Sequence, residues 1–203
     1  YNFTCATDKN SPTGFWNAEV KVGSVKFNKL IRIEAIMPNR LKIELHAGDD
    51  KLLVNNNTQN VTLHTNWLTG AKAKNLAANI NVVLSNNQTS FEKFSNYNFN
   101  DVTNRFETQN LTLFDGKVDE NGNTSMPLNF EISNAPGFLK ANFTTRVYEP
   151  GGTFSIDRFS IDYSPFTNYV GIKLPSGESN SGILYTGKSH QISIATVNYL
   201  GKA

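Results

Sequence analysis

Residues 138–163 read FLKANFTTRVYEPGGTFSIDRFSIDY, and this stretch decides the fold class. Apolar and polar residues alternate through Phe138–Tyr148 and again through Thr153–Tyr163, which is the period of a β-strand with one buried face. Between the two runs, Pro150-Gly151-Gly152 supplies the chemistry of a tight turn. We therefore expect two long antiparallel strands that are joined as a hairpin.

The same alternation recurs on both sides of this hairpin. Near the N-terminus, Trp16–Val22 and Ser24–Ile36 are separated by Gly23 and predict another hairpin, which Pro38 ends because proline cannot donate to a strand ladder. We expect Phe91–Phe99 to be an irregular strand or a long loop, since its aromatic residues do not alternate. The further predicted strands are Leu41–Leu45, Asn60–Trp67, Asn79–Leu84, Phe106–Phe114, Ser125–Ile132 and His190–Tyr199.

These strands predict an all-β protein built from immunoglobulin-like antiparallel β-sandwich domains, because no stretch of useful length shows helical periodicity. About seven strands fall between Leu41 and Tyr163, the number expected of one such domain. We therefore predict one complete sandwich over residues 38–166. Residues 1–37 and 167–203 hold too few strands to fold alone. They are either parts of flanking domains or two pieces that pair into one second sandwich.

Composition excludes several classes of function. The formal net charge is +2 with a pI near 8.6, and the basic residues are scattered, so we expect no nucleic-acid partner. The single cysteine, Cys5, rules out an internal disulfide, and we expect a buried, inert thiol. No apolar run approaches the length of a membrane span. The chain starts at Tyr1 without a leader pattern, and we expect it to be a piece of a longer protein.

One motif points away from a structural role. Residues Gly182–Ser189 match the phosphate-binding pattern G-x-x-x-x-G-K-S, which needs a strand before it and a helix after it so that backbone N–H groups meet the phosphates. Here Pro175–Ser181 is loop-like and His190–Tyr199 alternates as a strand. We therefore interpret the motif as a hairpin turn and expect no nucleotide partner.

No other set of side chains forms a catalytic, cofactor-binding or metal-binding pattern, so we predict no such residues and no enzyme activity. The histidines His46, His64 and His190 occur one to a strand, without a second ligand at suitable spacing along the chain. Acidic residues gather at Asp49-Asp50 and Asp119–Asn123, which we interpret as turns rather than calcium sites. Aromatic residues that could form a binding face are expected to be mostly buried; they are Trp67, Phe91, Phe94, Tyr97 and Phe99.

Several segments, in order along nearly the whole chain, resemble the bacterial alpha-2-macroglobulins. They are Pro12–Gly23, Met37–Lys42, Asn66–Leu76, Val147–Gly152 and Asn168–Lys173. The resemblance implies a string of macroglobulin domains, each a seven-stranded antiparallel sandwich. Residues 1–37 would be the last strands of one domain, residues 38–166 a complete domain and residues 167–203 the first strands of the next.

The resemblance also implies a role. Members of the family are large cell-envelope proteins, of the periplasm or cell surface, that trap attacking proteases after a bait region is cleaved, and many capture the protease through a Cys-x-Glu-Gln thioester. Cys5 is followed by Ala6, Thr7 and Asp8, so this chain departs from that motif and no thioester is assigned. We expect a scaffold segment whose partners are neighbouring macroglobulin domains and, through the parent protein, proteases. The alternative is a cell-surface binding module, an adhesin or carbohydrate-binding sandwich.

Overall fold

The computed structural model describes residues 4, 6, 14–33, 38–48, 52–55, 59–175 and 184–203. The chain divides into two compact units, Tyr1–Pro38 and Asn39–Ala203. In the described part of the chain, no helix has the length and apolarity to span a membrane. The elements are β1 (Gly14–Val22), β2 (Val25–Ile33), β3 (Leu41–Ala47), β4 (Leu52–Val54), β5 (Asn60–Trp67), β6 (Ala77–Asn86), the 3-10 turn η1 (Glu92–Phe94), β7 (Gln109–Lys117), β8 (Asn123–Pro127), β9 (Leu139–Tyr148), β10 (Phe154–Ser164), β11 (Asn168–Lys173) and β12 (Ser193–Asn198).

The first unit contains the predicted N-terminal hairpin. β1 and β2 pair antiparallel from Gly14 opposite Ile33 to Val22 opposite Val25. Gly23 turns the chain with a φ of 61°, which glycine adopts without steric cost. Residues opposite each other in this register share a face of the hairpin. One face is therefore mainly apolar, and it carries Trp16, Ala18, Val20, Val22, Val25, Phe27 and Ile31.

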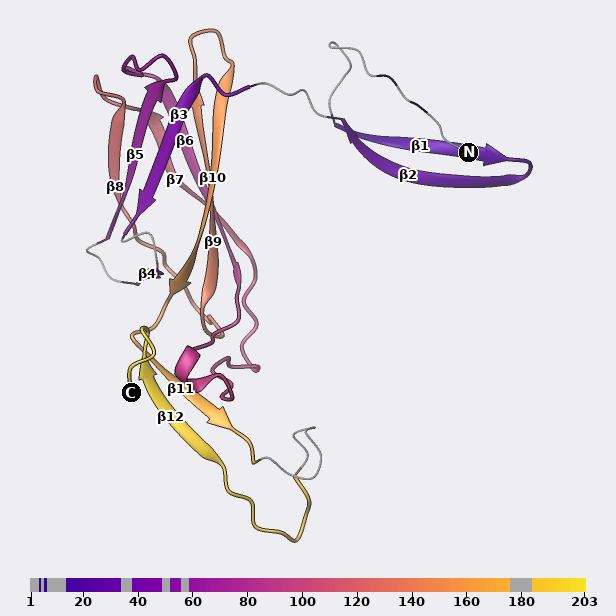
Figure 1. The fold of residues 1–203 in the computed structure, drawn as a ribbon, viewed down its shortest axis with the longest axis vertical. Coiled ribbons are helices and arrows are strands. Elements are labelled where there is room, and N and C mark those ends of the chain that lie inside the picture. The colour runs from indigo at the N-terminus through magenta and orange to yellow at the C-terminus, as the bar shows by residue number, and fades with distance from the viewer. Residues whose placement is uncertain are drawn as a thin grey trace. The chain divides into compact units, whose positions relative to one another are not determined.

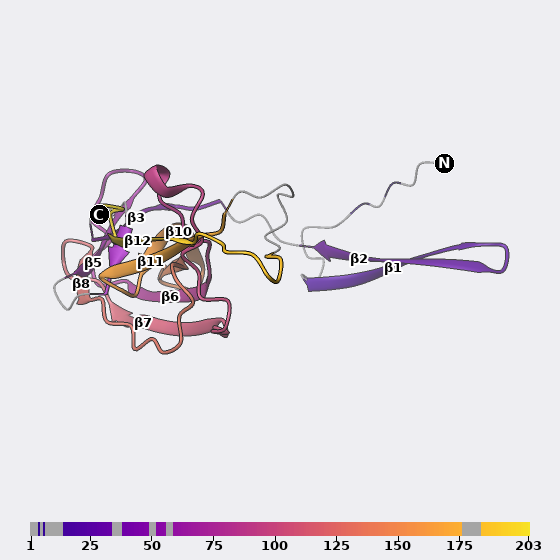
Figure 2. The same ribbon diagram turned by 90° about the horizontal axis from the view of Figure 1, so that it is seen from below.

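The second unit is a β-sandwich of two facing sheets, which confirms the predicted fold class (Figure 1). One sheet has the strand order β4-β10-β9-β6-β7 and the other β3-β5-β8. All neighbouring strands run antiparallel except β4 and β10, which are parallel. A two-stranded hairpin, β11–β12, lies at one end of the sandwich, the end nearest the viewer in Figure 2.

The core forms because the alternation places every second residue between the sheets. Along β9 and β6 burial alternates without a break, so that Leu139, Ala141 and Phe143 point inward while their neighbours are partly exposed. The largest fully buried side chains are Tyr163, Phe143, Leu41, Leu53, Leu63, Ile80 and Leu84. At roughly 25 cal/mol per Å² of apolar surface, this layer is the main stabilising contribution to the unit.

The central predicted hairpin is confirmed, with β9 and β10 paired from Leu139 opposite Tyr163 to Tyr148 opposite Phe154. Two expectations need correction. The described residues contain eight strands between Leu41 and Ser164, because β4 was not expected. β8 ends at Pro127 rather than Ile132, although Leu128 and Phe130 beyond it remain in the core. Phe91–Phe99 forms a loop with one 3-10 turn, which confirms the second of the two predicted forms, a long loop.

Candidate functional site: the two ends of the sandwich

The segment that matches the phosphate-binding motif, Gly182–Ser189, lies in the connection between β11 and β12. Gly187 has a φ of 75°, and the Lys188 ammonium lies 5.6 Å from the ring centre of Tyr185, where cation–π attraction holds it. The next regular element is the strand β12, so the described residues place no helix N-terminus behind this turn. Residues 182 and 183 of the motif lie outside the described residues.

The other predicted sites divide between described and undescribed residues. Asp119 makes the expected turn, because its Oδ1 accepts hydrogen bonds from the backbone N–H groups of Asn121 and Asn123, both at 2.8 Å. Gly122, with a φ of 82°, completes this turn between β7 and β8. Cys5 and Asp49-Asp50 lie outside the described residues. The described part of the chain holds no group of three His, Cys, Asp or Glu side chains that could enclose a metal ion.

Polar contacts instead gather where the chain enters the sandwich, a region we name the upstream junction (Asn39, Arg40, Trp67, Glu149 and Ser155). The Arg40 guanidinium donates to the Glu149 carboxylate at 2.8 Å, and its carbon lies 5.5 Å from the ring centre of Trp67. The Glu149 side chain is only 5% exposed, so its charge depends on this partner. The ion pair therefore fixes the start of β3 to the turn that follows β9.

Ser155 and Asn39 add hydrogen bonds to the same junction. The Ser155 hydroxyl accepts from the backbone N–H groups of Arg40, at 3.0 Å, and Leu41, at 3.2 Å. The side-chain amide of Asn39 bonds to both the N–H and the carbonyl of Ile156, as a neighbouring strand would. The segment just before β3 is thus hydrogen-bonded to the first residues of β10.

At the opposite end, aromatic side chains form a second, separate cluster, which we name the downstream junction (Phe91, Phe99, Phe138, Tyr169 and Val197). Each of these residues is 7% exposed or less. The Phe91 ring meets the rings of Phe99 and Phe138 edge-on, with centroids 4.8 and 5.5 Å apart, a favourable arrangement. Tyr169 and Val197 come from β11 and β12, so the cluster packs the hairpin against the sandwich.

The predicted burial of the aromatic stretch is therefore confirmed for Phe91 and Phe99. Trp67, Phe94 and Tyr97 are partly buried and pack at the edges of the two hydrophobic clusters. All five aromatic side chains are therefore buried or partly buried, and the alternative, a surface binding module, gains no support from them.

Backbone contacts reinforce the downstream junction. Asn98 and Ile172 exchange N–H···O=C hydrogen bonds at 2.9 Å in both directions, which attaches the loop after β6 to β11. Gly171 lies against the Phe99 ring so closely that a Cβ atom would come within 2.5 Å of it. A glycine is required there because any side chain would displace the ring.

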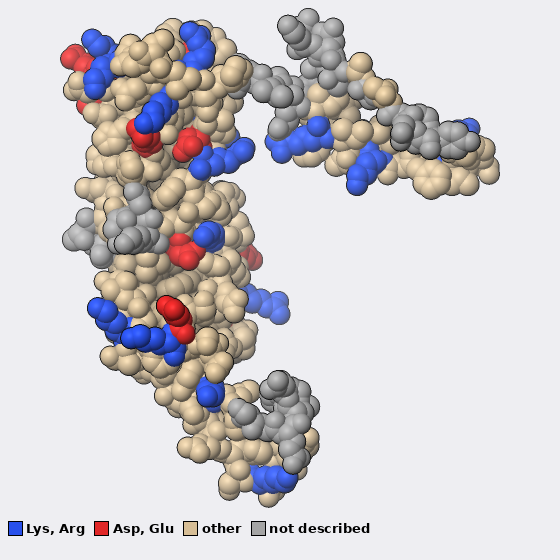
Figure 3. All heavy atoms as spheres, in the orientation of Figure 1, with Lys and Arg blue, Asp and Glu red and all other residues tan. Residues whose placement is uncertain are grey.

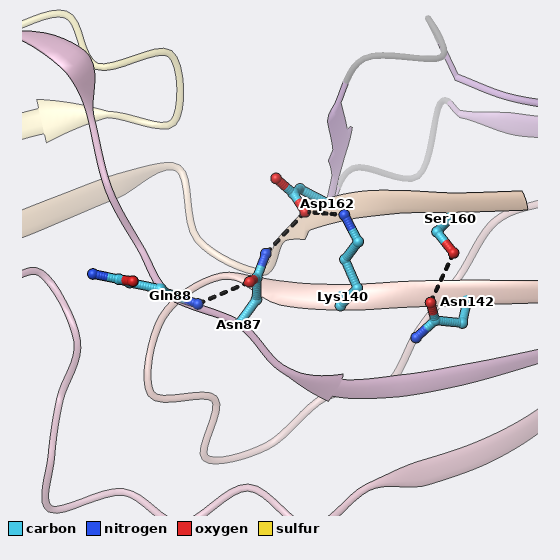
Figure 4. A network of polar contacts seen from close by, with 6 residues as sticks. All are labelled: Asn87, Gln88, Lys140, Asn142, Ser160 and Asp162. Atoms are coloured by element: carbon cyan, nitrogen blue, oxygen red, sulfur yellow. Dashed lines mark hydrogen bonds and ion pairs between the residues drawn. The ribbon is translucent and has the colours of Figure 1, made fainter.

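Polar side chains hold the end of β10 beside this cluster. Figure 4 shows Asp162 of β10 accepting hydrogen bonds from Asn87 and from Lys140 of β9, each at 2.8 Å. The backbone N–H of Asn87 in turn donates to the carbonyl of Phe138, at 3.1 Å. Two residues on, the Ser164 hydroxyl bonds to the Tyr169 hydroxyl and to the carbonyl of Phe166. β10 is therefore bound to the chain that leaves the sandwich.

On the face of the sandwich seen in Figure 3, acidic and basic side chains are interspersed rather than gathered by sign. The described contacts at both junctions join one chain segment to another. They hold the two ends of the β-sandwich in fixed positions. Residues 39–203 thus form a β-sandwich module whose two ends are held by specific contacts.

Comparison with known proteins identifies the family. The model of the bacterial alpha-2-macroglobulin MG5 domain matches residues 39–159. This match covers more than half of the chain, which therefore belongs to the bacterial alpha-2-macroglobulin MG5 domain family. No curated protein sequence gives a significant match.

Solved structures show the same fold. Native Escherichia coli alpha-2-macroglobulin matches with a TM-score of 0.63 and 19% identity, over 96% of this chain and 13% of that one. The elastase-activated Escherichia coli protein gives 0.59 and 19%, over 96% and 17%. A Y1175G mutant of Salmonella alpha-2-macroglobulin gives 0.57 and 18%, over 81% and 11%. The chain thus spans between 11% and 17% of the length of these relatives.

Proposed function

We propose that this chain is a scaffold segment of a bacterial alpha-2-macroglobulin-like endopeptidase inhibitor, which traps proteases by a change of conformation. The observation that carries the proposal is the family match over residues 39–159, which begins at the upstream junction and spans the sandwich through the middle of β10. The segment itself contributes no catalytic group and needs no cofactor. Its work is mechanical.

The mechanical role rests on two strands that reach both junctions. β9 follows Phe138 in the downstream junction and ends next to Glu149 in the upstream one. Its ten residues span about 33 Å at the usual rise of a strand. β10 returns from Ser155 to Ser164. A displacement imposed at one end of this hairpin is therefore passed to the other end, because both strands are hydrogen-bonded along their length.

We infer three parts in the chain: residues 1–37 as the last strands of a preceding macroglobulin-like domain, 38–166 as a complete one, and 167–203 as the first strands of the next. The exposed apolar face of β1–β2 supports this, since Phe27 is 59% exposed and Val22 62%. So does β11–β12, whose outer face exposes Val170 and Ile194, and Val170 lines a hollow of about 480 Å³. The alternative, that residues 1–37 and 167–203 pair into one second sandwich, would bury the same surfaces.

The partners we propose are neighbouring macroglobulin domains of the parent chain and, through the parent, proteases. The similar Escherichia coli protein has been obtained in trypsin-activated and elastase-activated forms, which supports proteases as the target class. We place the parent in the periplasm or on the cell surface, where a lipoprotein anchor would lie outside this segment. Neither nucleic acid nor nucleotide is a proposed partner.

The experiment that tests the function uses the full-length parent protein. The parent is incubated with trypsin or elastase, and the protease is then assayed on a large protein substrate and on a small peptide. Trapping predicts that cleavage of the protein substrate falls while cleavage of the peptide continues. The matched control is the parent with its scaffold loosened by Tyr169→Ala, which should be cleaved equally but trap less. If the parent leaves cleavage of both substrates unchanged, the proposal is wrong.

A further inference from the structure

The fold brings two histidines together that are far apart in the sequence. In the pairing of β3 with β5, Leu45 lies opposite Leu63, which puts His46 and His64 on the same exposed face at diagonal positions. Their ring centroids are 6.0 Å apart. The spacing along the chain gave no sign of this, because the register of two strands sets it.

The ring of His64 is oriented by a neighbouring side chain. The Oδ1 atom of Asn123 on β8 lies 3.0 Å from Nδ1 of His64. An amide oxygen only accepts, so Nδ1 carries the proton of this hydrogen bond, and in the neutral ring the lone pair is then on Nε2. Metal-binding histidines typically have this arrangement, with one nitrogen donating to an oxygen and the other facing the ion.

An acidic side chain, Glu44, lies beside His64 on the same face of the sheet. Glu44 is directly opposite His64 in the register, as Asn123 is on the other side. The Lys42 ammonium lies 2.8 Å from Oε1 of Glu44. The carboxylate thus lies on the face that carries the two imidazoles, where the ion pair with Lys42 offsets part of its charge.

The two rings are close enough to reach one ion after a small movement. Two imidazole nitrogens bound at about 2.1 Å place the ring centroids roughly 5 Å apart in a tetrahedral site. The observed 6.0 Å exceeds this separation, and rotation of the two exposed side chains would close the difference. The sheet beneath is rigid, because Leu45 and Leu63 are buried in the core at 6% and 0% exposure.

We propose that His46 and His64 form a binding site for a late first-row divalent cation, Zn²⁺, Ni²⁺ or Cu²⁺, on the exposed face of the β3–β5–β8 sheet. Imidazole nitrogen is a preferred ligand of these ions. The described residues supply no cluster of three ligands, so water completes the coordination. Bound metal cross-links two strands of the folded state and stabilises it.

The test titrates the untagged, metal-free chain with Ni²⁺ and with Zn²⁺ by calorimetry, and follows thermal unfolding with and without each ion. We expect one saturable site and a higher unfolding temperature with metal. His46→Gln and His64→Gln should each lower affinity at least tenfold and remove the thermal shift. His190→Gln is the matched control, since this partly exposed histidine bonds to the carbonyl of Tyr185 in another part of the unit, and the variant should bind metal as the wild type does.

A second measurement identifies the ligands directly. Cu²⁺ bound to the wild-type chain should give an electron paramagnetic resonance spectrum with coupling to two imidazole nitrogens, and the His46→Gln/His64→Gln double variant should lack it. Circular dichroism without metal shows that the variants fold. The proposal is overturned if the double variant binds as tightly as the wild type, or if His190→Gln weakens binding as much as the other substitutions do.

Discussion

At the scale of single residues, Arg40 and Glu149 are 109 positions apart in the sequence, and yet their side chains form an ion pair at 2.8 Å in the upstream junction. The two ends of the pair differ, since the Arg40 side chain is 69% exposed and that of Glu149 only 5%. The exposed Arg40 guanidinium therefore compensates the charge of the buried Glu149 carboxylate. Removing the Arg40 side chain leaves the Glu149 carboxylate without its partner, and burial prevents that carboxylate from regaining full hydration.

We predict that Arg40→Ala lowers the free energy of unfolding by about 1–2 kcal/mol, the usual cost of leaving a buried polar group without its partner. Chemical denaturation followed by tryptophan fluorescence measures the change. Glu149→Gln should cost less, because its amide oxygen still accepts from Arg40.

The comparison variant for this prediction is Lys42→Gln. Lys42 pairs with Glu44 at 2.8 Å, but these side chains are 60% and 42% exposed. Exposed pairs contribute little, so this change should stay within about 0.5 kcal/mol. Equal losses in Arg40→Ala and Lys42→Gln would contradict the role assigned to the upstream junction.

At the scale of elements, the two hairpins outside the sandwich differ in support. β11–β12 packs Tyr169 and Val197 into the downstream junction. β1–β2 belongs to the other compact unit, and in the described residues its strands pair only with each other. An isolated two-stranded hairpin is marginally stable in water.

Hydrogen exchange should reveal this difference in the isolated chain. We predict that amides of β1 and β2 exchange within seconds to minutes near neutral pH, that those of β11 and β12 are slower, and that those of β6 and β9 are slowest because they open only with the whole sandwich. Mass spectrometry of peptic fragments measures all three. Protection of β1–β2 equal to that of β9 would show that the hairpin has a partner in this chain.

The sequence predicts elements of this kind well when the evidence is local. Alternation and the Pro150-Gly151-Gly152 turn are enough to predict β9–β10. β4 escapes prediction because it has three residues and pairs in parallel with β10, about 110 positions further on. The same limit applies to both junctions: burial of Phe91 follows from its type, but its contact with Tyr169 depends on a register that no local pattern encodes.

At the scale of the whole molecule, stability should depend on pH through two tyrosines near the downstream end. Burial raises the pKa of Tyr163 strongly, and it also raises that of Tyr169, where the hydrogen bond with Ser164 acts in the opposite direction. In the unfolded chain both phenols ionise near pH 10. Above that pH the unfolded state loses protons that the folded state keeps, so the free energy of unfolding falls.

We predict a decline in the urea midpoint between about pH 9.5 and pH 11 that becomes shallower in the Tyr163→Phe/Tyr169→Phe double variant. The comparison of slopes isolates these two groups from the lysines and the other tyrosines, which titrate in both proteins. A double variant with the same slope as the wild type would exclude buried tyrosine as the cause.

The bond between Arg40 and Ser155 has a consequence for how the protein is made. This hydrogen bond joins positions 115 apart in the sequence, and β4 likewise pairs with β10, which comes much later in the chain. The first strands of the sandwich therefore have no complete set of partners until the last one has been synthesised, and contacts of such sequence separation form slowly. Until about residue 164 has emerged from the ribosome, the sandwich therefore cannot close, and its early strands stay without their final partners.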